Sequence, residues 1–100
     1  MGNDDSVRIK QERIHILRRR ILDLLDHAYP EKMDEIEISE CLKSRVGTKP
    51  ILKEMHYLAD KGLVTLEPAL EGDTRARLTA RGRDFLTGDV EEVGISTLQE

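Results

Sequence analysis

The chain has 100 residues, 38% of them hydrophobic and 36% charged, with two tyrosines, one phenylalanine, no tryptophan and a formal net charge of −4. A chain of this length forms one domain, and its core must be aliphatic because aromatic rings are so few. The single cysteine excludes an intrachain disulfide and indicates a reducing cytoplasm, while no apolar run approaches the ~20 residues of a membrane span.

The first predicted element is a long amphipathic helix over residues 7–28, preceded by a disordered N-terminus, residues 1–6. Ser6 is its expected N-cap, and the helix ends before Pro30, because a residue that precedes proline avoids the helical region. Residues 7–10 alternate in polarity, so a short leading strand is the alternative. The apolar positions recur at helical spacing and are Ile14, Leu17, Ile21, Leu24, Leu25 and Ala28.

Ile9 and Ile16 lie seven residues apart on this helix and away from its main apolar side. They predict a homodimer in which the helix pairs with that of a second copy across a two-fold axis. The alternative is that both side chains pack on the chain's own final helix or C-terminal tail.

Three consecutive arginines, residues 18–20, follow on the same helix. Because successive helical residues are about 100° apart, these side chains fan over about 200° and cannot all face one phosphate backbone. We expect a solvated face that pairs with Asp23 and Asp26, with at most one arginine near DNA.

A second, shorter helix is predicted over residues 35–44. Asp34 and Glu37 have the spacing of a capping box at its start. Its apolar face consists of Ile36, Ile38, Cys41 and Leu42, so we interpret Cys41 as a small core residue and not as a redox sensor. Alternation over residues 35–38 leaves a short strand as the alternative.

A turn over residues 44–47, with Val46 packed inward, leads to a third helix over residues 48–61. Thr48 is its predicted N-cap, and Gly62 marks its end because glycine adopts the left-handed conformation at little cost. Its apolar side consists of Ile51, Leu52, Met55, Leu58 and Ala59, whereas Lys49, Lys53, His56, Tyr57 and Asp60 fall on the other side.

A two-stranded hairpin follows the third helix. Residues 63–66 are rich in strand formers, residues 67–74 contain turn residues, and residues 75–78 alternate between charged and apolar side chains. Arg75 and Arg77 therefore project from the same face of the hairpin.

Thr79 is the predicted N-cap of a short final helix over residues 80–86, which ends at Thr87 and Gly88. Residues 88–100 form an acidic C-terminal tail with four acidic residues and no basic one. Without this tail, the chain has 16 acidic and 16 basic residues. We expect a solvated chain end, with shielding of a DNA-binding face as the alternative.

Two stretches resemble winged helix-turn-helix DNA-binding proteins. Residues 58–64, LADKGLV, look like the L-x-x-x-G-L-[IV] junction between recognition helix and wing. Residues 78–86, LTARGRDFL, look like the L-T-x-x-G-x-x-[FL]-L that follows the wing in MarR-like and PadR-like regulators. The resemblance covers about residues 18–87. It implies a mainly α fold with a small β-hairpin (α+β) over residues 7–87: an extended first helix, three further helices and a two-stranded wing.

The resemblance also implies sequence-specific binding to double-stranded DNA and a role in transcriptional regulation. The helix over residues 48–61 would enter the major groove, and the wing over residues 63–78 would lie on the backbone. The acidic wing tip, residues 71–73, is a departure that argues against deep insertion of the wing. The residues that this placement assigns to DNA contact are Thr48, Lys49, Lys53, His56, Tyr57, Arg75 and Arg77.

A winged-helix module that binds a protein partner and not DNA is the alternative, favoured by the negative net charge, the acidic tail and the acidic wing tip. The histidines and the cysteine have no metal-ligand spacing, and the glycines form no phosphate loop. The many carboxylates are expected to be solvated charge, with no marked catalytic pair. We therefore expect no enzymatic activity, no cofactor and no metal.

Overall fold

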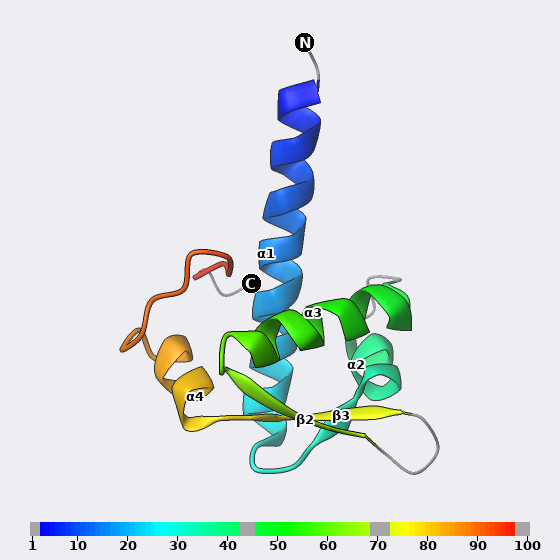
Figure 1. The fold of residues 1–100 in the computed structure, drawn as a ribbon, viewed down its shortest axis with the longest axis vertical. Helices are drawn as coiled ribbons and strands as arrows, with labels where there is room; N and C mark the ends of the chain where they lie inside the picture. Colours follow the sequence, from blue (N-terminus) through cyan, green and yellow to red (C-terminus); the bar gives the residue numbers. More distant parts are fainter. Residues whose placement is uncertain (1–2, 43–45, 69–72, 98–100) are drawn as a thin grey trace.

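The computed structural model describes residues 3–42, 46–68 and 73–97 (Figure 1). Within these ranges the chain is mainly helical, with four helices and one small antiparallel sheet, which confirms the α+β class. The predicted hairpin is present, but the sheet contains a third strand, so its strand count differs from the two strands predicted. The elements are α1 (Asn3–Ala28), β1 (Met33–Asp34), α2 (Glu35–Leu42), α3 (Thr48–Asp60), β2 (Val64–Pro68), β3 (Thr74–Leu78) and α4 (Ala80–Leu86).

The first helix starts earlier than predicted. It begins at Asn3, so residues 3–6 are helical and not disordered, Ser6 lies inside the helix, and no leading strand forms at residues 7–10. Neither glycine nor proline occurs in residues 3–6, so no strong helix breaker ends the helix there. Its end at Ala28 is as predicted, just before the cis peptide bond between Tyr29 and Pro30. No helix of the described residues is both long enough and apolar enough to cross a membrane.

The additional strand, β1, is an edge strand that the sequence analysis did not predict. Its two residues, Met33 and Asp34, pair with Ala76 and Arg75 of β3, so the strand order is β1-β3-β2. A strand of two residues is too short to show alternation, which is the signal that sequence analysis uses. The alternative strand at residues 35–38 is wrong, because these residues form the first turn of α2.

The starts of α2 and α3 depend on different caps. In the predicted capping box, the Glu37 amide donates to Asp34 Oδ1 at 2.8 Å and the Asp34 amide donates to Glu37 Oε1 at 3.0 Å. The N-cap of α3 is Gly47 and not Thr48, and no side chain caps it. Thr48 is already helical, so its hydroxyl is not the cap that the sequence predicts.

Two glycines and one threonine join the hairpin to its neighbouring helices. Gly62 has φ 78°, the left-handed conformation predicted after α3. At Gly82 a Cβ atom would overlap the carbonyl oxygen of Leu63, so no larger residue fits there. Thr79, the predicted N-cap of α4, donates to the Gly62 carbonyl at 2.7 Å and accepts from the Gly82 amide at 3.0 Å. Thr79 thus holds α4 against the start of β2.

The short second helix turns only part of its predicted apolar face inward. Ile38 is buried, while Ile36 is 44% exposed and Cys41 is exposed, so the interpretation of Cys41 as a core residue is wrong. Glu35 is buried instead. Its carboxylate is satisfied there, because it accepts a hydrogen bond from the Thr74 amide at 3.2 Å. The buried side of α2 therefore runs from Glu35 through Ile38, and Cys41 lies at its edge.

The core lies between α1, α3 and the inner face of the sheet, and α4 and the C-terminal segment extend it. Val46 packs partly buried against it, as predicted. The buried hydrophobic residues are Ile21, Leu22, Leu25, Ile38, Ile51, Met55, Leu58, Leu63, Val64, Ala76, Leu78, Phe85 and Ile95.

Residues 88–97 form a strap that leads from α4 to α1 (Figure 1). The prediction of a solvated chain end is wrong for the part of the strap that contacts α1, whereas Asp89, Glu91 and Val93 are exposed. Ile95 is only 4% exposed within the core. The Ser96 amide donates to the His15 carbonyl at 3.1 Å. Glu92 forms ion pairs with Lys61, at 3.6 Å, and with Arg81. One acidic residue of the strap, Glu92, is thus paired within the chain.

Two of the three consecutive arginines are not solvated, contrary to prediction. Arg18 donates to the Gly94 carbonyl at 2.9 Å, and Arg19, only 5% exposed, donates to the Ser96 carbonyl at 3.3 Å. The predicted pairing with Asp23 is present, at 3.1 Å from Arg19. The arginines therefore anchor the strap to α1 instead of forming a polar surface.

Candidate nucleic-acid interface

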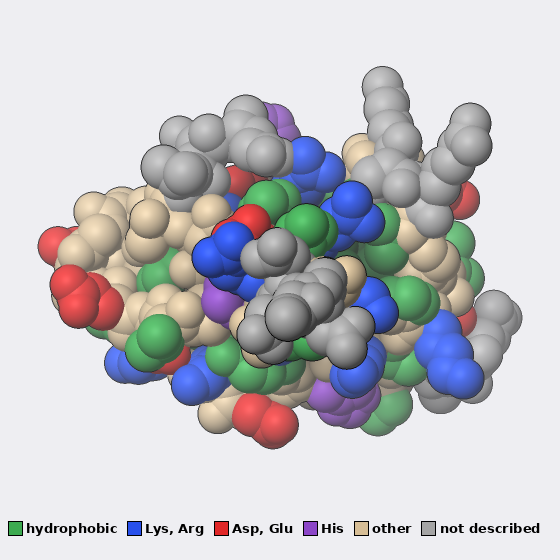
Figure 2. Space-filling view, turned by 90° about the horizontal axis from the view of Figure 1, so that it is seen from above, with side chains coloured by type: hydrophobic (Ala, Val, Ile, Leu, Met, Phe, Trp, Pro, Cys, Tyr) green, Lys and Arg blue, Asp and Glu red, His purple; other side chains and the backbone are tan. Residues whose placement is uncertain are grey.

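The exposed side of α3 carries a stripe of basic side chains. Lys49, Lys53 and His56 are all exposed, and their spacing places them on one side of the helix. The opposite side is buried through Ile51 and Met55. Figure 2 shows Lys, Arg and His side chains along the edge over α3, with acidic groups among them. The predicted surface of this helix is therefore accessible.

Thr48 is exposed at the start of the same helix, beside the basic stripe. It lies where a recognition helix would first meet a nucleic acid. Asp60, also exposed, ends the stripe with a negative charge. The cationic part of α3 is thus its N-terminal half.

Tyr57, the fifth predicted contact on this helix, is oriented differently. Its ring is half-buried, and the Arg18 guanidinium carbon lies 3.5 Å from the ring centroid. The Tyr57 hydroxyl occupies the space that a Cβ on Gly94 would need. Tyr57 therefore packs against α1 and the strap, away from the Lys49–His56 stripe.

The link between α2 and α3 is held by a side chain that the sequence analysis did not single out. The Ser39 hydroxyl donates to the Val46 carbonyl at 2.7 Å, which ties α2 to the segment that enters α3. Residues 43–45 of the predicted turn lie outside the described residues. A direct bond between helix and approach segment limits how α3 can tilt relative to α2.

The junction of α3 with the hairpin is also tied by the backbone. The Leu63 amide donates to the Leu58 carbonyl at 3.0 Å, and the Thr79 amide donates to the Leu63 carbonyl at 3.0 Å. The start of α3 and the ends of β2 and β3 nearest the hairpin turn lie on the same side of the molecule (Figure 1). Of the predicted acidic wing tip, Asp73 is half-buried, and residues 71 and 72 lie outside the described ranges.

Arg75 and Arg77 project from one face of β3, as predicted. Both are exposed, while Ala76 and Leu78 between and after them are buried in the core. The two arginines therefore lie on the outer face of the sheet, and the α3 stripe lies on the solvent side of a helix that packs on its inner face. The seven predicted residues do not form one cluster.

Four further residues at the outer face of the sheet were missed by the sequence analysis. The ring of Tyr29 lies under two guanidinium groups, with its centroid 5.5 Å from Arg77 and 4.7 Å from Arg83. Lys32, next to β1, forms an ion pair with Glu67 of β2. These residues come from three separate elements, so no local sequence pattern could have grouped them.

The Lys32 ammonium perturbs the carboxylate that it meets. Its hydrogen bond and its positive charge hold the pKa of Glu67 below the ordinary value of 4.5, and the charge of Arg75 acts in the same direction. Glu67 therefore remains ionised at neutral pH and offsets part of the positive charge on this face.

The described residues include no group of three or more His, Cys, Asp or Glu side chains that could hold a metal ion. Comparison of the chain with protein-family models, with curated proteins and with solved structures gives no significant match. Functional inference therefore depends on the residues and contacts described above.

Proposed function

We propose that this domain is a winged helix-turn-helix that binds double-stranded DNA and regulates transcription. In this proposal α3 enters the major groove and the β2–β3 hairpin lies on the phosphate backbone. The observation that carries it is the exposed stripe of Lys49, Lys53 and His56 on a helix followed directly by a hairpin. The two sequence stretches that resemble the family lie at the two ends of this hairpin.

The chemistry of the stripe suits a nucleic acid. A lysine ammonium donates to phosphate oxygens or to the O6 and N7 acceptors of guanine, and a threonine hydroxyl can reach either kind of group. Lys49 and Lys53 are one helical turn apart on the same side of α3, so both side chains would lie in the same groove of the DNA. Thr48 lies beside them at the end of α3 that leads into the groove.

The negative net charge belongs to the whole chain, and three of the carboxylates that contribute to it lie in ion pairs that do not belong to the α3 stripe. Glu54 pairs with Arg18, Glu67 with Lys32, and Glu92 with Lys61 and Arg81. What DNA meets is the local field of the α3 stripe and not the charge of the whole chain.

The contact set differs from that expected from the sequence. Arg75 is proposed as a phosphate contact on the hairpin, and Arg77 as a weaker one because its guanidinium stacks on Tyr29. Tyr57 is not included, since its ring packs under Arg18. The proposed contacts are thus Thr48, Lys49, Lys53, His56, Arg75 and Arg77.

The test is the salt dependence of binding of the full chain to a labelled random-sequence duplex. About three or four phosphate contacts give a log–log slope of roughly −3 per protomer. The Lys49→Ala/Lys53→Ala variant should weaken binding and make the slope shallower by about 2 per protomer. Lys10→Ala, which removes an exposed cation from α1, is the matched control and should leave α3-mediated binding nearly unchanged.

If the double variant loses no more than twice the binding free energy that Lys10→Ala loses, only net charge matters, which contradicts a role for α3. Absence of binding even at low salt would exclude general DNA affinity. That result would favour a second candidate, a winged-helix module that binds a protein. Its supporting observation is the outer sheet face, where Tyr29 lies with Arg77 and Arg83, since tyrosine and arginine are enriched at protein interfaces.

A further inference from the structure

The N-terminal part of α1 projects from the body of the molecule without covering it (Figure 1). Every residue from 6 to 13 is exposed, and Ile9 retains 48% of its accessible surface. A helical segment this short gains little stability by itself in water. We call residues 6–13 the overhang.

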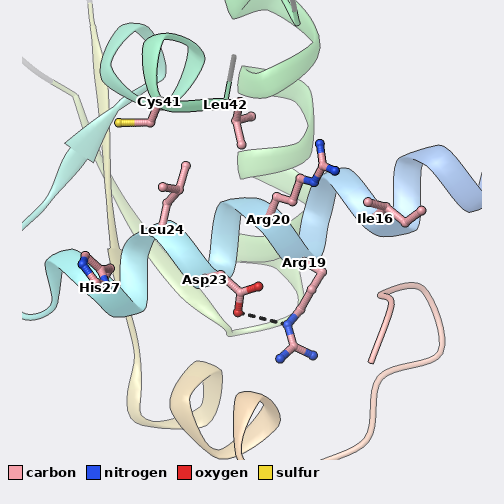
Figure 3. Close-up of a pocket in the computed structure, with 8 residues that line it drawn as sticks. All are labelled: Ile16, Arg19, Arg20, Asp23, Leu24, His27, Cys41 and Leu42. Carbon is pink, nitrogen blue, oxygen red and sulfur yellow. Dashed lines mark hydrogen bonds and ion pairs between the residues drawn. The ribbon is translucent and has the colours of Figure 1, made fainter. Parts of the chain in front are cut away.

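The overhang has an apolar position on the side of α1 that faces away from the core. At about 100° per residue, Ile9 and Ile16 differ by only about 20° around the helix, on the side opposite Ile21 and Leu25. This side leads into an open groove of about 450 Å³ between α1 and α2, lined in part by Ile16, Leu24 and Leu42. Leu24 of α1 and Leu42 of α2 point toward each other across the groove (Figure 3).

One pair of charges on this side of α1 is complementary to its own reversed copy. On the two sides of the midpoint between Glu12 and Arg13, an acidic residue mirrors a basic one. Ile9 and Ile16 are also equidistant from this midpoint. The side chains of Glu12 and Arg13 make no hydrogen bond or ion pair within the described part of the chain.

We propose that α1 pairs antiparallel with α1 of a second copy, across a two-fold axis between Glu12 and Arg13. An isologous contact requires a surface that is complementary to itself, and Glu12 and Arg13, with opposite charges on the two sides of the axis, supply this property. Ile9 would meet Ile16 of the second copy, and Glu12 would meet its Arg13, each contact being formed twice. The overhang of each copy would lie along residues 12–19 of α1 in the other copy and cover Ile16, at the near end of the groove.

This inference goes beyond the proposed function and does not depend on it, because its test involves no DNA. Sedimentation equilibrium of the full chain should show a dimer, and Ile9→Asp should raise the dimer dissociation constant by at least roughly tenfold, since it places a charge at an apolar contact. Val7→Asp is the matched control: Val7 is 54% exposed on the same overhang but about 200° away around the helix.

A charge exchange tests the orientation. Glu12→Arg and Arg13→Glu should each weaken the homodimer, whereas an equimolar mixture of the two variants should form a heterodimer, because opposite charges then meet at both positions. A wild-type chain that remains monomeric, equal effects of Val7→Asp and Ile9→Asp, or no preference for the heterodimer would each overturn the proposal. Circular dichroism of every variant would verify that the fold is kept.

Discussion

Arg18 joins three parts of the molecule through one guanidinium group. Its Nε lies 2.7 Å from Glu54 Oε1 of α3, its Nη1 donates to the Gly94 carbonyl of the strap, and its carbon lies over the Tyr57 ring. The side chains of Arg18 and Glu54 are only 15% and 7% exposed. At such burial an ion pair is costly to break, because the remaining charge stays poorly solvated.

We therefore expect Glu54→Ala to lower the free energy of unfolding by about 3 kcal/mol. Glu54→Gln should cost less, since the amide oxygen can still accept from Arg18. Urea denaturation monitored by circular dichroism measures both values. Glu40→Ala, at an exposed position of α2, is the control and should be nearly neutral. A loss no larger than that of the control would contradict the structural role of this pair.

The ion pair of Glu67 with Lys32 has a measurable pH signature. Because hydrogen bonding and charge lower the pKa of Glu67 in the folded chain, its stabilising effect is present above the unfolded pKa and is lost as pH falls through the lowered native value. NMR titration of the Glu67 carboxyl should give a midpoint below 4.5, and Lys32→Ala should raise it. An unchanged midpoint in this variant would assign the shift to Arg75 instead.

At the scale of elements, the joint between α3, the hairpin and α4 determines where the hairpin points. It depends on a close approach at Gly82, where a Cβ would overlap the Leu63 carbonyl and lie 2.6 Å from Leu78 Cδ1. Leu63 cannot move freely, because its amide and carbonyl are bonded to Leu58 and Thr79. This contact explains why a glycine follows the leucine-threonine pair in the stretch LTARG.

Gly82→Ala should therefore destabilise the fold by roughly 2 kcal/mol, although alanine is the better helix former by about 1 kcal/mol. Thermal unfolding measures the effect. Asp84→Ala, at an exposed position of the same helix, provides the comparison. A stabilised Gly82→Ala variant would mean that helix propensity outweighs the steric contact and that the joint is looser than the geometry indicates.

At the scale of the whole molecule, the strap closes the core on the side of α1 opposite α2. It contributes Ile95 to the core and receives Arg18 and Arg19 on its carbonyl groups. Glu92 adds contacts to Lys61, at the end of α3, and to Arg81, in the first turn of α4. The strap thus connects α1, α3 and α4 by apolar and polar contacts together.

Ile95→Ala should lower the free energy of unfolding by about 2–4 kcal/mol, because it removes buried methyl groups and leaves a cavity. Val93→Ala, two residues away and 95% exposed, is the matched control and should change stability little. Chemical denaturation of the full chain compares the two. Similar small effects of both substitutions would show that the strap does not belong to the cooperative unit.

Most features that depend on neighbouring residues were predictable from the sequence, although the N-caps predicted at Ser6 and Thr48 are wrong. The periodicity of α1 and α3, the capping box of α2, the cap of α4, the left-handed Gly62 and the accessible α3 stripe all follow from residues within one or two turns of each other. The spacing of residue types along the chain predicts interactions of this short range directly.

What only the tertiary structure decided involves contacts between distant residues. Arg18 meets residues 36 and 76 positions away, and these contacts bury Glu54 and draw Tyr57 from the predicted DNA-facing set. β1 forms because β3 has an edge with which Met33 and Asp34 can pair. The C-terminal segment packs on the domain because Ile95 is buried in the core. Cys41 is exposed because α2 buries a different side. These contacts and exposures depend on which surfaces pack together after the helices form, and local sequence patterns do not specify that packing.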